Sequence, residues 1–180
     1  MIAWPRFDHP ILGIRVPSKL VAGGFDVVSR EIADGDSVTR RPAASSRVVR
    51  SRMSKQRRRD TQPELLVRKI LHSRGIRYRV DARPEADLRC KADLSWKGIR
   101  LAVFIDGCFW HGCPDHKTSP KANEEWWALK LAGNVQRDRR TDGELSERGW
   151  TVLRFWEHED PEAVADAICH QIEALRAGCG

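Results

Sequence analysis

Residues 104–116, Phe-Ile-Asp-Gly-Cys-Phe-Trp-His-Gly-Cys-Pro-Asp-His, form the stretch on which the fold and its chemistry depend. Core packing alone does not require this mixture of cysteines, histidines, acids and aromatic residues. The apolar run 101–105 leads into the stretch and predicts a buried strand. Because α/β folds usually place their sites where strands end, we expect a functional site immediately after this strand.

Length, charge and cysteine usage narrow the class of protein. The chain has 180 residues, enough for one domain of ordinary size with a real core. Its net charge of +7 favours a polyanionic partner, nucleic acid first, over a merely basic soluble protein. No membrane-span-length apolar run and no signal-peptide pattern stand out, so we expect a cytoplasmic protein, nucleoid-associated when bound to DNA. Five cysteines in that reducing compartment favour metal ligation or free thiols over disulfides.

The chain divides into an N-terminal extension and a folded domain. Gly, Pro, Ser and Asp interrupt residues 1–52, and no hydrophobic periodicity persists there. The run 47–59 holds seven basic residues and no acid. We therefore expect a poorly ordered basic extension over 1–52 and one folded domain over 53–180.

Periodicity within that domain predicts an α/β fold with a central mixed β-sheet flanked by helices. Thr61 and Glu64 have capping-box spacing, and Gly75 follows the apolar helical pattern. Lys97-Gly98 suits a tight hairpin turn, and the long helix between the last two strands suits a parallel pair. The expected elements are a helix over 61–75, strands over 77–80, 92–96 and 99–105, a helix over 123–149, a strand over 150–156 and a helix from 160.

Cysteine and histidine spacing indicates a metal site. Cys108, Cys113 and His116 read C-x4-C-x2-H, and such spacings are typical of zinc chelates. His158, just past the strand 150–156, is the best fourth ligand because strand ends at one sheet edge converge. A structural zinc would hold an otherwise irregular loop in place. The alternative is a pair of free cysteines with surface histidines.

Acids near the same strand ends suggest a second, catalytic site. Asp93 and Asp106 lie on the two hairpin strands and suit a hard cation such as Mg²⁺. His111 suits a general acid or base, and Asp138 could orient it. Each has a structural alternative, as a strand-end cap, a turn acid or a partner for a neighbouring arginine, and Glu64 already has a place in the capping box. Their convergence with the loop favours the catalytic interpretation.

Five motifs in order and spacing resemble the very short patch repair (Vsr) DNA mismatch endonuclease family, over about residues 53–160. They are Asp-Thr-x-Pro-Glu at 60–64, Ala-Asp-Leu at 92–94, Phe-Ile-Asp-Gly-Cys-Phe-Trp-His at 104–111, Asn-Val-x-Arg-Asp-Arg-Arg at 134–140 and Trp-Glu-His at 156–158. The Gly-Cys-Phe-Trp-His core is chemically unusual and therefore specific. The resemblance implies a restriction-endonuclease-like fold with a structural zinc site, and a monomeric, Mg²⁺-dependent enzyme. It also implies nicking of one strand beside the thymine of a T:G mismatch, the product of 5-methylcytosine deamination.

The resemblance also implies a role for each matching residue. Asp93 would be the principal Mg²⁺ ligand, with the backbone carbonyl of Ile105. His111 and Asp138 would form the acid/base pair, with Glu64 as an auxiliary acid. The remaining assignments are structural zinc at Cys108, Cys113, His116 and His158, and intercalation into the base stack by Phe109, Trp110 and Trp127. Asp106 is included among the catalytic residues with its role open, because the best-known member has a histidine there.

The partner implied by the resemblance is double-stranded DNA containing a T:G mismatch, with other mismatch-repair proteins as further candidates. Two other functions stay open at this point. One is a related restriction-like or defence nuclease with a different DNA specificity. The other is a zinc-stabilised DNA-binding module without catalysis, which would have no need of Asp93, His111 and Asp138.

Overall fold

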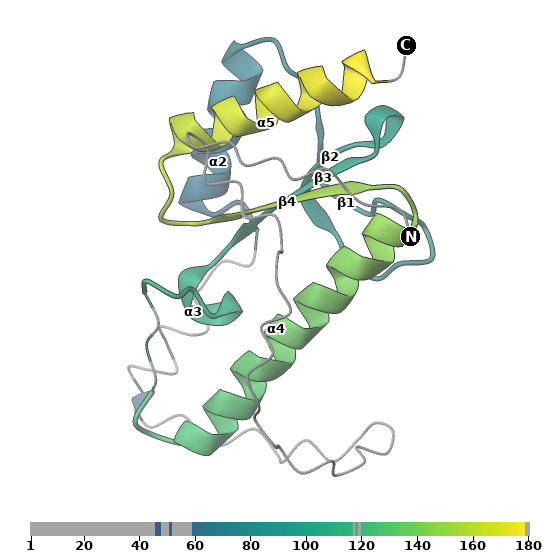
Figure 1. Ribbon diagram of the computed structural model, residues 1–180. Helices are drawn as coiled ribbons and strands as arrows, with labels where there is room; N and C mark the ends of the chain where they lie inside the picture. Colours follow the sequence, from purple (N-terminus) through teal and green to yellow (C-terminus); the bar gives the residue numbers. More distant parts are fainter. Residues whose placement is uncertain (1–45, 48–50, 52–58, 117, 119, 179–180) are drawn as a thin grey trace. The chain divides into compact units, whose positions relative to one another are not determined.

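The strand predicted ahead of the Cys/His-rich stretch forms as β3 (Leu101–Asp106), inside a four-stranded mixed sheet of order β1-β2-β3-β4 (Figure 1). Strand β2 (Ala92–Trp96) pairs antiparallel with β1 (Arg79–Ala82) and with β3. Strand β4 (Thr151–Trp156) pairs parallel with β3 from the Leu101–Thr151 pair to the Asp106–Trp156 pair. The expected α/β class and mixed sheet are therefore confirmed.

The computed structural model describes residues 46, 47, 51, 59–116, 118 and 120–178. The chain divides into two units, Met1–Ala43 and Ala44–Gly180, and all described residues belong to the second. Apart from residues 46, 47 and 51, the basic extension expected over 1–52 lies outside the described residues, so its boundary at 53 stays a prediction. Within the described part of the chain, no helix combines the length and the apolar composition needed to cross a membrane.

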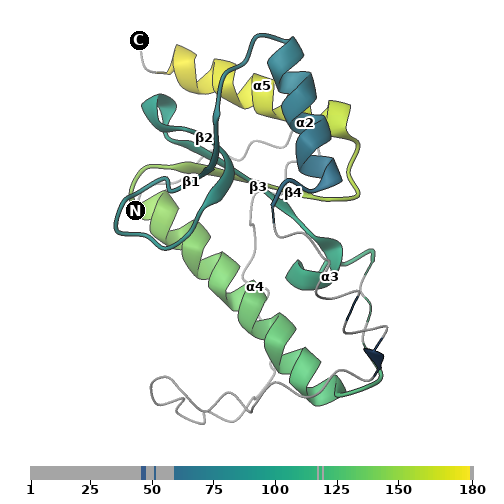
Figure 2. The same ribbon diagram turned by 180° about the vertical axis from the view of Figure 1, so that it is seen from behind.

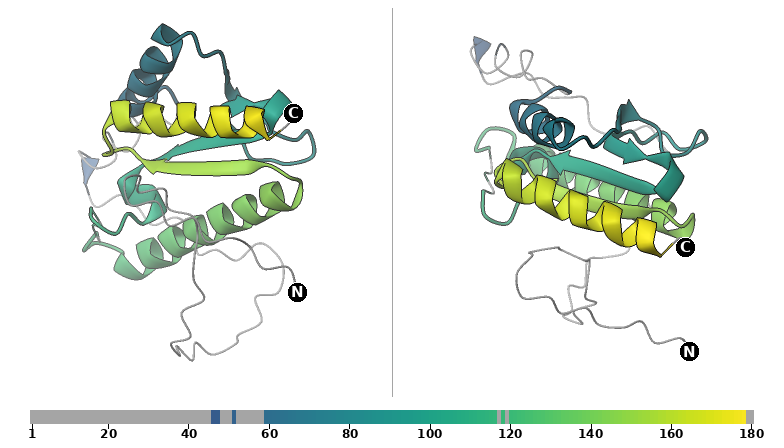
Figure 3. Two further views of the ribbon diagram at one scale, coloured as in Figure 1. Left: turned by 45° about the horizontal axis from the view of Figure 1, so that its top comes forward. Right: turned by 90° about the horizontal axis from the view of Figure 1, so that it is seen from above.

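Helices cover both faces of the sheet, as Figure 3 shows. Helices α2 (Gln62–Ser73) and α5 (Pro161–Ala177) pack on one face, and α4 (Glu124–Glu147) packs on the other. Side chains alternate along β3, so Leu101 and Val103 join the first core, and Ala102 and Phe104 join the second. Burial on both faces explains why β3 reads as a continuous apolar run and not as an alternating pattern.

The same alternation decides which helix the polar end of the sheet meets. Asp106 continues the Ala102–Phe104 face, and Arg154 pairs with Phe104 across the β3–β4 register. Both side chains therefore point toward α4. On α4, Asn134, Asp138 and Asp142 recur every four residues and so share one face of the helix.

Two helix ends follow the sequence pattern. Gly75 takes φ +77° after α2, the left-handed conformation that suits a helix C-terminus. Asp160 caps α5 by accepting a hydrogen bond from the backbone N–H of Ala163 at 3.0 Å. Both signals act within one turn of the helix end, so they can be read from the sequence without knowledge of the tertiary fold.

The starts of α2 and α4 have less side-chain capping than their residue types would allow. The Thr61 hydroxyl does not accept a backbone N–H of α2; it donates to Glu64 Oε1 at 2.8 Å. Glu64 Oε2 accepts the backbone N–H of Asp60, the residue before the N-cap, at 2.9 Å, so Glu64 bonds across the helix start but not in the predicted capping-box pattern. Asn123 occupies the N-cap position of α4, but with φ +58° and no side-chain cap bond.

Three element boundaries also differ. Strand β1 starts at Arg79 and not at 77, because its pairing with β2 runs through Arg79–Ser95 and Val80–Leu94. The hairpin turn is a short 3-10 helix, η1 (Lys97–Ile99), closed by Arg100 in the left-handed region. The stretch expected to be an irregular loop begins with a helical turn, α3 (Cys108–His111), at the end of β3 and beside α4 (Figure 2).

Candidate active site

Asp93 and Ile105 lie together where β2 and β3 reach the polar end of the sheet. The backbone N–H of Ile105 donates to Asp93 Oδ2 at 2.7 Å, so the carboxylate takes a position beside the main chain of β3. Burial raises the pKa of Asp93 to about 7, and the negative charges of Glu64 and Asp106 add to the effect although the Ile105 hydrogen bond opposes it. A strongly perturbed carboxyl at a strand end is a functional-site signal.

Glu64 belongs to the same group of acids through the start of α2. Its side chain is buried, with 5% of its surface exposed, and its carboxylate accepts from Thr61 and from the Asp60 backbone. These bonds fix Glu64 at the first turn of the helix, where the helix dipole favours a negative charge. The position therefore places a buried carboxyl group near Asp93.

His111 and Asp138 form a close pair between α3 and α4. His111 Nδ1 lies 2.6 Å from Asp138 Oδ2 and 3.5 Å from Asp106 Oδ1. Burial disfavours the charged imidazole, but the Asp138 hydrogen bond and the two carboxylates outweigh burial and raise the pKa of His111. The buried Asn134 side chain donates to the backbone carbonyl of Trp110 at 3.1 Å, which ties α3 to α4.

Asp106 is held by Arg154 in a paired, two-oxygen contact. Arg154 Nη1 lies 3.0 and 2.8 Å from the two carboxylate oxygens of Asp106, and Nε donates to Asp142 at 2.9 Å. The guanidinium also lies over the Phe104 ring, 4.4 Å from its centroid. Asp106 is 8% exposed, so its negative charge is compensated inside the protein.

Cys108, Cys113, His116 and His158 converge at the loop beyond α3, with their ligand atoms within 4.8 Å of one another. His158 Nδ1 lies 3.0 Å from Cys108 Sγ and 3.8 Å from Cys113 Sγ, and His116 Nδ1 lies 3.8 Å from Cys113 Sγ. Tetrahedral zinc, with Zn–S of ~2.3 Å and Zn–N of ~2.0–2.1 Å, would separate sulfur and nitrogen by about 3.5 Å. The residues present therefore fit a four-coordinate metal ion.

Thiol chemistry at this cluster agrees with a metal-ligand set. Burial and the neighbouring Cys113 raise the pKa of Cys108 to about 12, so without a cation this thiol keeps its proton. A coordinated metal deprotonates such a thiol outright. The cluster joins the residues after β3 to His158, which lies just beyond β4. A second contact links the same two places: the backbone N–H of Cys108 donates to Glu157 Oε1 at 2.7 Å.

Phe109, Trp110 and Trp127 form one aromatic cluster beside the acid site, and Trp126 extends it. The Phe109 ring centroid lies 5.0 Å from that of Trp110 and 5.4 Å from that of Trp127, both in edge-to-face geometry. All of these rings are only partly buried. Phe109 and Trp110 are therefore not core residues: they pack on one another and on Trp127 at the surface.

Three polar residues at this site escaped the sequence analysis: Asn134, Asp142 and Arg154. Asn134 and Asp142 flank Asp138 at intervals of four, which was a readable stripe on one helix face. Arg154 is a cation inside the apolar strand pattern 150–156, and a charge at such a position needs a partner. Each signal was present, but the partners lie on other elements.

Known proteins resemble this chain over the same elements. The family model for the DNA mismatch endonuclease Vsr matches residues 44–117. The type II nicking enzyme V.NaeI of Lentzea aerocolonigenes is 43% identical over 128 residues, covering 70% of this chain and 77% of the relative. The type II nicking enzyme V.NmeDIP of Neisseria meningitidis serogroup C is 38% identical over 59% of this chain and 72% of its own length.

A relative named for mismatch cleavage is also similar. The DNA mismatch endonuclease Vsr of Escherichia coli K12 is 38% identical over 101 residues, covering 55% of this chain and 62% of that protein. The matched family, the extent of these identities and the mixed sheet with its acid and Cys/His clusters agree with one another. The chain therefore belongs to the Vsr family of DNA mismatch endonucleases, and it is a DNA-cleaving hydrolase with the restriction-endonuclease-like fold of that family.

Proposed function

We propose that the protein nicks one DNA strand beside the thymine of a T:G mismatch by Mg²⁺-dependent phosphodiester hydrolysis. One observation carries the proposal: three kinds of group gather around the junction of β3 and α3. They are an acid cluster (Glu64, Asp93 and Asp106), the His111–Asp138 pair, and the half-buried rings of Phe109, Trp110 and Trp127. The first two serve hydrolysis of a phosphodiester, and the third serves recognition of an unstable base step. The words "nicking enzyme" in the names of the relatives support cleavage of a single strand.

The donors at the ends of β2 and β3 suit a hard divalent cation. The Asp93 carboxylate and the Ile105 carbonyl are both oxygen ligands, the kind that Mg²⁺ prefers. The raised pKa of Asp93 reflects burial and neighbouring acids, and a cation would relieve that repulsion. Mg²⁺ bound there would polarise the scissile phosphoryl group. Glu64, fixed by its two hydrogen bonds, serves as the auxiliary acid.

His111 is the residue we assign to proton transfer. In the imidazole tautomer protonated at Nδ1, His111 donates a hydrogen bond to Asp138 Oδ2. The other ring nitrogen, Nε2, is then the one that exchanges a proton with water or DNA. Asp138 holds the ring in this orientation and favours its charged form. The pair thus has the arrangement that a general acid or base needs, a positioned imidazole with a carboxylate behind it.

Asp106 we assign to positioning His111, not to binding the cation. Arg154 contacts both oxygens of Asp106, and Asp106 Oδ1 also lies 3.5 Å from His111 Nδ1. A carboxylate engaged this way has little free charge to offer Mg²⁺. Its negative charge instead adds to that of Asp138 on the imidazole, and Arg154 keeps that charge acceptable in a buried place.

The Cys/His cluster and the aromatic cluster complete the proposal. Zinc on Cys108, Cys113, His116 and His158 would fix the residues that follow β3, and so hold α3 in position. Phe109, Trp110 and Trp127 would enter the base stack next to the mismatch, where unstacking costs less than in a fully paired duplex. The metal cluster is then structural, and the acid cluster is chemical.

Nicking of a labelled duplex tests the proposal directly. One duplex carries a single T:G pair and its control carries T:A, each with Mg²⁺ and with EDTA. We expect one new break beside the thymine of the T:G duplex, with Mg²⁺ only. Equal cutting of both duplexes would favour the related nuclease of other specificity, and tight binding without cutting would favour the non-catalytic binding module.

A further inference from the structure

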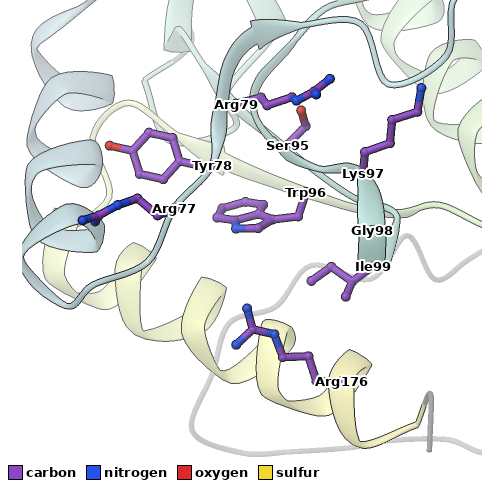
Figure 4. Close-up of a pocket in the computed structure, with 9 residues that line it drawn as sticks. All are labelled: Arg77, Tyr78, Arg79, Ser95, Trp96, Lys97, Gly98, Ile99 and Arg176. Carbon is purple, nitrogen blue, oxygen red and sulfur yellow. The ribbon is translucent and has the colours of Figure 1, made fainter.

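A cationic pocket lies at the end of the sheet opposite the acid cluster. Its volume is about 450 Å³, within the range of small-ligand sites, and it is lined by Arg77, Tyr78, Arg79, Ser95, Trp96, Lys97, Gly98, Ile99 and Arg176 (Figure 4). Leu101 pairs with Trp96 at this end of β3, and Asp106 lies at the other end, about 17 Å away at ~3.3 Å per residue. The pocket is therefore separate from the active site.

The charges around this pocket are not balanced. Arg77, Arg79, Lys97 and Arg176 line it, and no lining residue is acidic. Within the described residues, none of these four cations makes an ion pair, whereas Arg68, Arg74, Arg148 and Arg154 all do. Arg176 has a partial explanation, because a cation suits the last turn of α5. The other three cations come from β1, the segment before it and η1, and have no such reason to gather.

A second observation points to a ligand. The Trp96 side chain is 9% exposed, and its Nε1 is a buried donor with no hydrogen-bond partner among the described residues. Figure 4 shows the indole in the centre of the lining residues, with its nitrogen on the side of Arg176. A buried N–H without an acceptor costs free energy, so such a group calls for an explanation.

We propose that this pocket binds a nucleoside phosphate, either a free nucleotide or the end nucleotide of a DNA strand. Phosphoryl oxygens would accept from the Trp96 indole and from the guanidinium of Arg176, which lie on the same side of β2 (Figure 4). Arg79 pairs with Ser95, so its side chain and that of Lys97 lie on the other side of the strand and add positive charge only at longer range. Tyr78, Trp96 and Ile99 provide an apolar surface for a base. A membrane headgroup or an acidic peptide would lack the ring that this surface suits.

The indole N–H resonances of the full-length protein report binding. AMP is titrated first, then a single-stranded DNA tetramer with and without a 5′-phosphate, and Trp96→Phe assigns the Trp96 signal. We expect a saturable shift of that signal, with the signals of Trp110 and Trp127 unchanged. Saturation by AMP identifies a free nucleotide as sufficient, and saturation by the 5′-phosphorylated tetramer alone identifies a strand end.

Matched charge variants test whether the nucleotide probes bind at this pocket. Arg176→Gln should weaken the affinity by roughly tenfold or more, the effect of losing a charge-assisted hydrogen bond. Arg79→Gln removes a charge on the opposite side of β2, so its effect should be smaller. Lys69→Gln removes the same charge from an exposed place on α2 and should leave the affinity unchanged. Nicking of the T:G duplex should persist in all three variants. An equal loss in Lys69→Gln, shifts only at Trp110 or Trp127, or no Trp96 shift with any probe would each refute the pocket.

Discussion

Arg154 is the side chain on which the arrangement of acids at the site depends. It bridges Asp106, which is 48 residues away in the chain, and Asp142, which is 12 residues away. Asp106 lies on the α4 face of the sheet and Asp142 lies on α4 itself, so without the guanidinium two acids would face each other in a poorly solvated place. A single cation on β4 therefore decides whether the polar end of the sheet is stable.

Removal of the Arg154 charge should destabilise the protein, and neutralising Asp106 in the same chain should restore part of the lost stability. Arg154→Met should lower the free energy of unfolding by about 3–5 kcal/mol, because Asp106 stays buried without a counter-charge. Adding Asp106→Asn in the same chain should recover part of that loss. Urea unfolding of the two single variants and the double variant measures the coupling, and strictly additive losses would contradict the buried pair.

Asp93 and Asp106 should respond differently to the cation. Asp93→Ala should abolish nicking but keep binding of the T:G duplex, since a cation ligand is lost and the aromatic cluster is not. Asp106→Asn should slow nicking with no change in the Mg²⁺ concentration for half-maximal rate. Single-turnover nicking across a Mg²⁺ series measures both; a higher Mg²⁺ requirement in Asp106→Asn would make Asp106 a ligand after all.

At the level of elements, the short helix α3 carries both the rings to which we assign mismatch recognition and the histidine to which we assign proton transfer. It presents Phe109 and Trp110 to solvent and His111 to Asp138, and Asn134 ties it to α4. Four residues cannot form a stable helix alone, so α3 exists only through these neighbours. Its position is therefore sensitive both to the rings it carries and to the glycine that ends it.

Loss of one ring should weaken mismatch selectivity. Trp110→Ala should reduce the preference for T:G over T:A duplex by ~1–3 kcal/mol, the usual range for a lost base–aromatic stack. Leu129→Ala is the control, because Leu129 is 71% exposed on α4 and outside the ring cluster. Competition binding with the two duplexes measures the preference. If Trp110→Ala behaves like Leu129→Ala, the intercalation assignment fails.

The end of α3 provides a stability test. Gly112 has φ +71°, and a Cβ there would lie 3.3 Å from Val135 Cγ2 on α4. Gly112→Ala should therefore destabilise the protein by about 1–2 kcal/mol through left-handed strain, with any crowding added to that. Gly98→Ala, where nothing lies within 4 Å and the backbone is not left-handed, should cost less. Thermal unfolding compares the two, and equal losses would show that α3 tolerates the side chain.

Elements with strong local signals could be predicted from the sequence, and those that depend on distant partners could not. Apolar runs in the sequence predict strands β3 and β4, and the Asp160-Pro161 start predicts helix α5. The predicted bounds of β1 differ from the structure by two residues, because its pairing with β2 sets its ends. Helix α3 has no period of its own, and Glu64 accepts from Asp60 and Thr61 in a pattern that capping-box spacing alone does not predict. The four members of the Cys/His cluster were predicted together, but the Arg154 contacts needed the fold.

At the scale of the whole domain, the Cys/His cluster links described residues that lie far apart in the sequence. It joins Cys108, Cys113 and His116 to His158, across the entire length of α4. A metal ion there would restrict the unfolded chain much as a covalent cross-link of a long loop does. Its removal should therefore affect the stability of the whole domain and not only the loop.

Metal analysis and unfolding of cysteine variants test this. The purified protein should hold one zinc per chain, and Cys108→Ser or Cys113→Ser should lose it together with several degrees of thermal stability. Cys90→Ser and Cys169→Ser change cysteines outside the cluster and should keep the metal. A wild-type protein without stoichiometric zinc, or zinc retained in both cluster variants, would contradict the structural zinc site.

The parallel pairing of β3 with β4 has a consequence for the order in which the enzyme is assembled during synthesis. Every group that we assign to chemistry, from Glu64 to Asp138, precedes the end of α4. The arginine that neutralises Asp106 and the last histidine of the Cys/His cluster follow it, on and just after β4. A chain that has emerged from the ribosome only as far as α4 thus contains all of its reactive groups without the parts that align them. We therefore expect a chain of that length to be inactive until β4 pairs with β3 at the edge of the sheet.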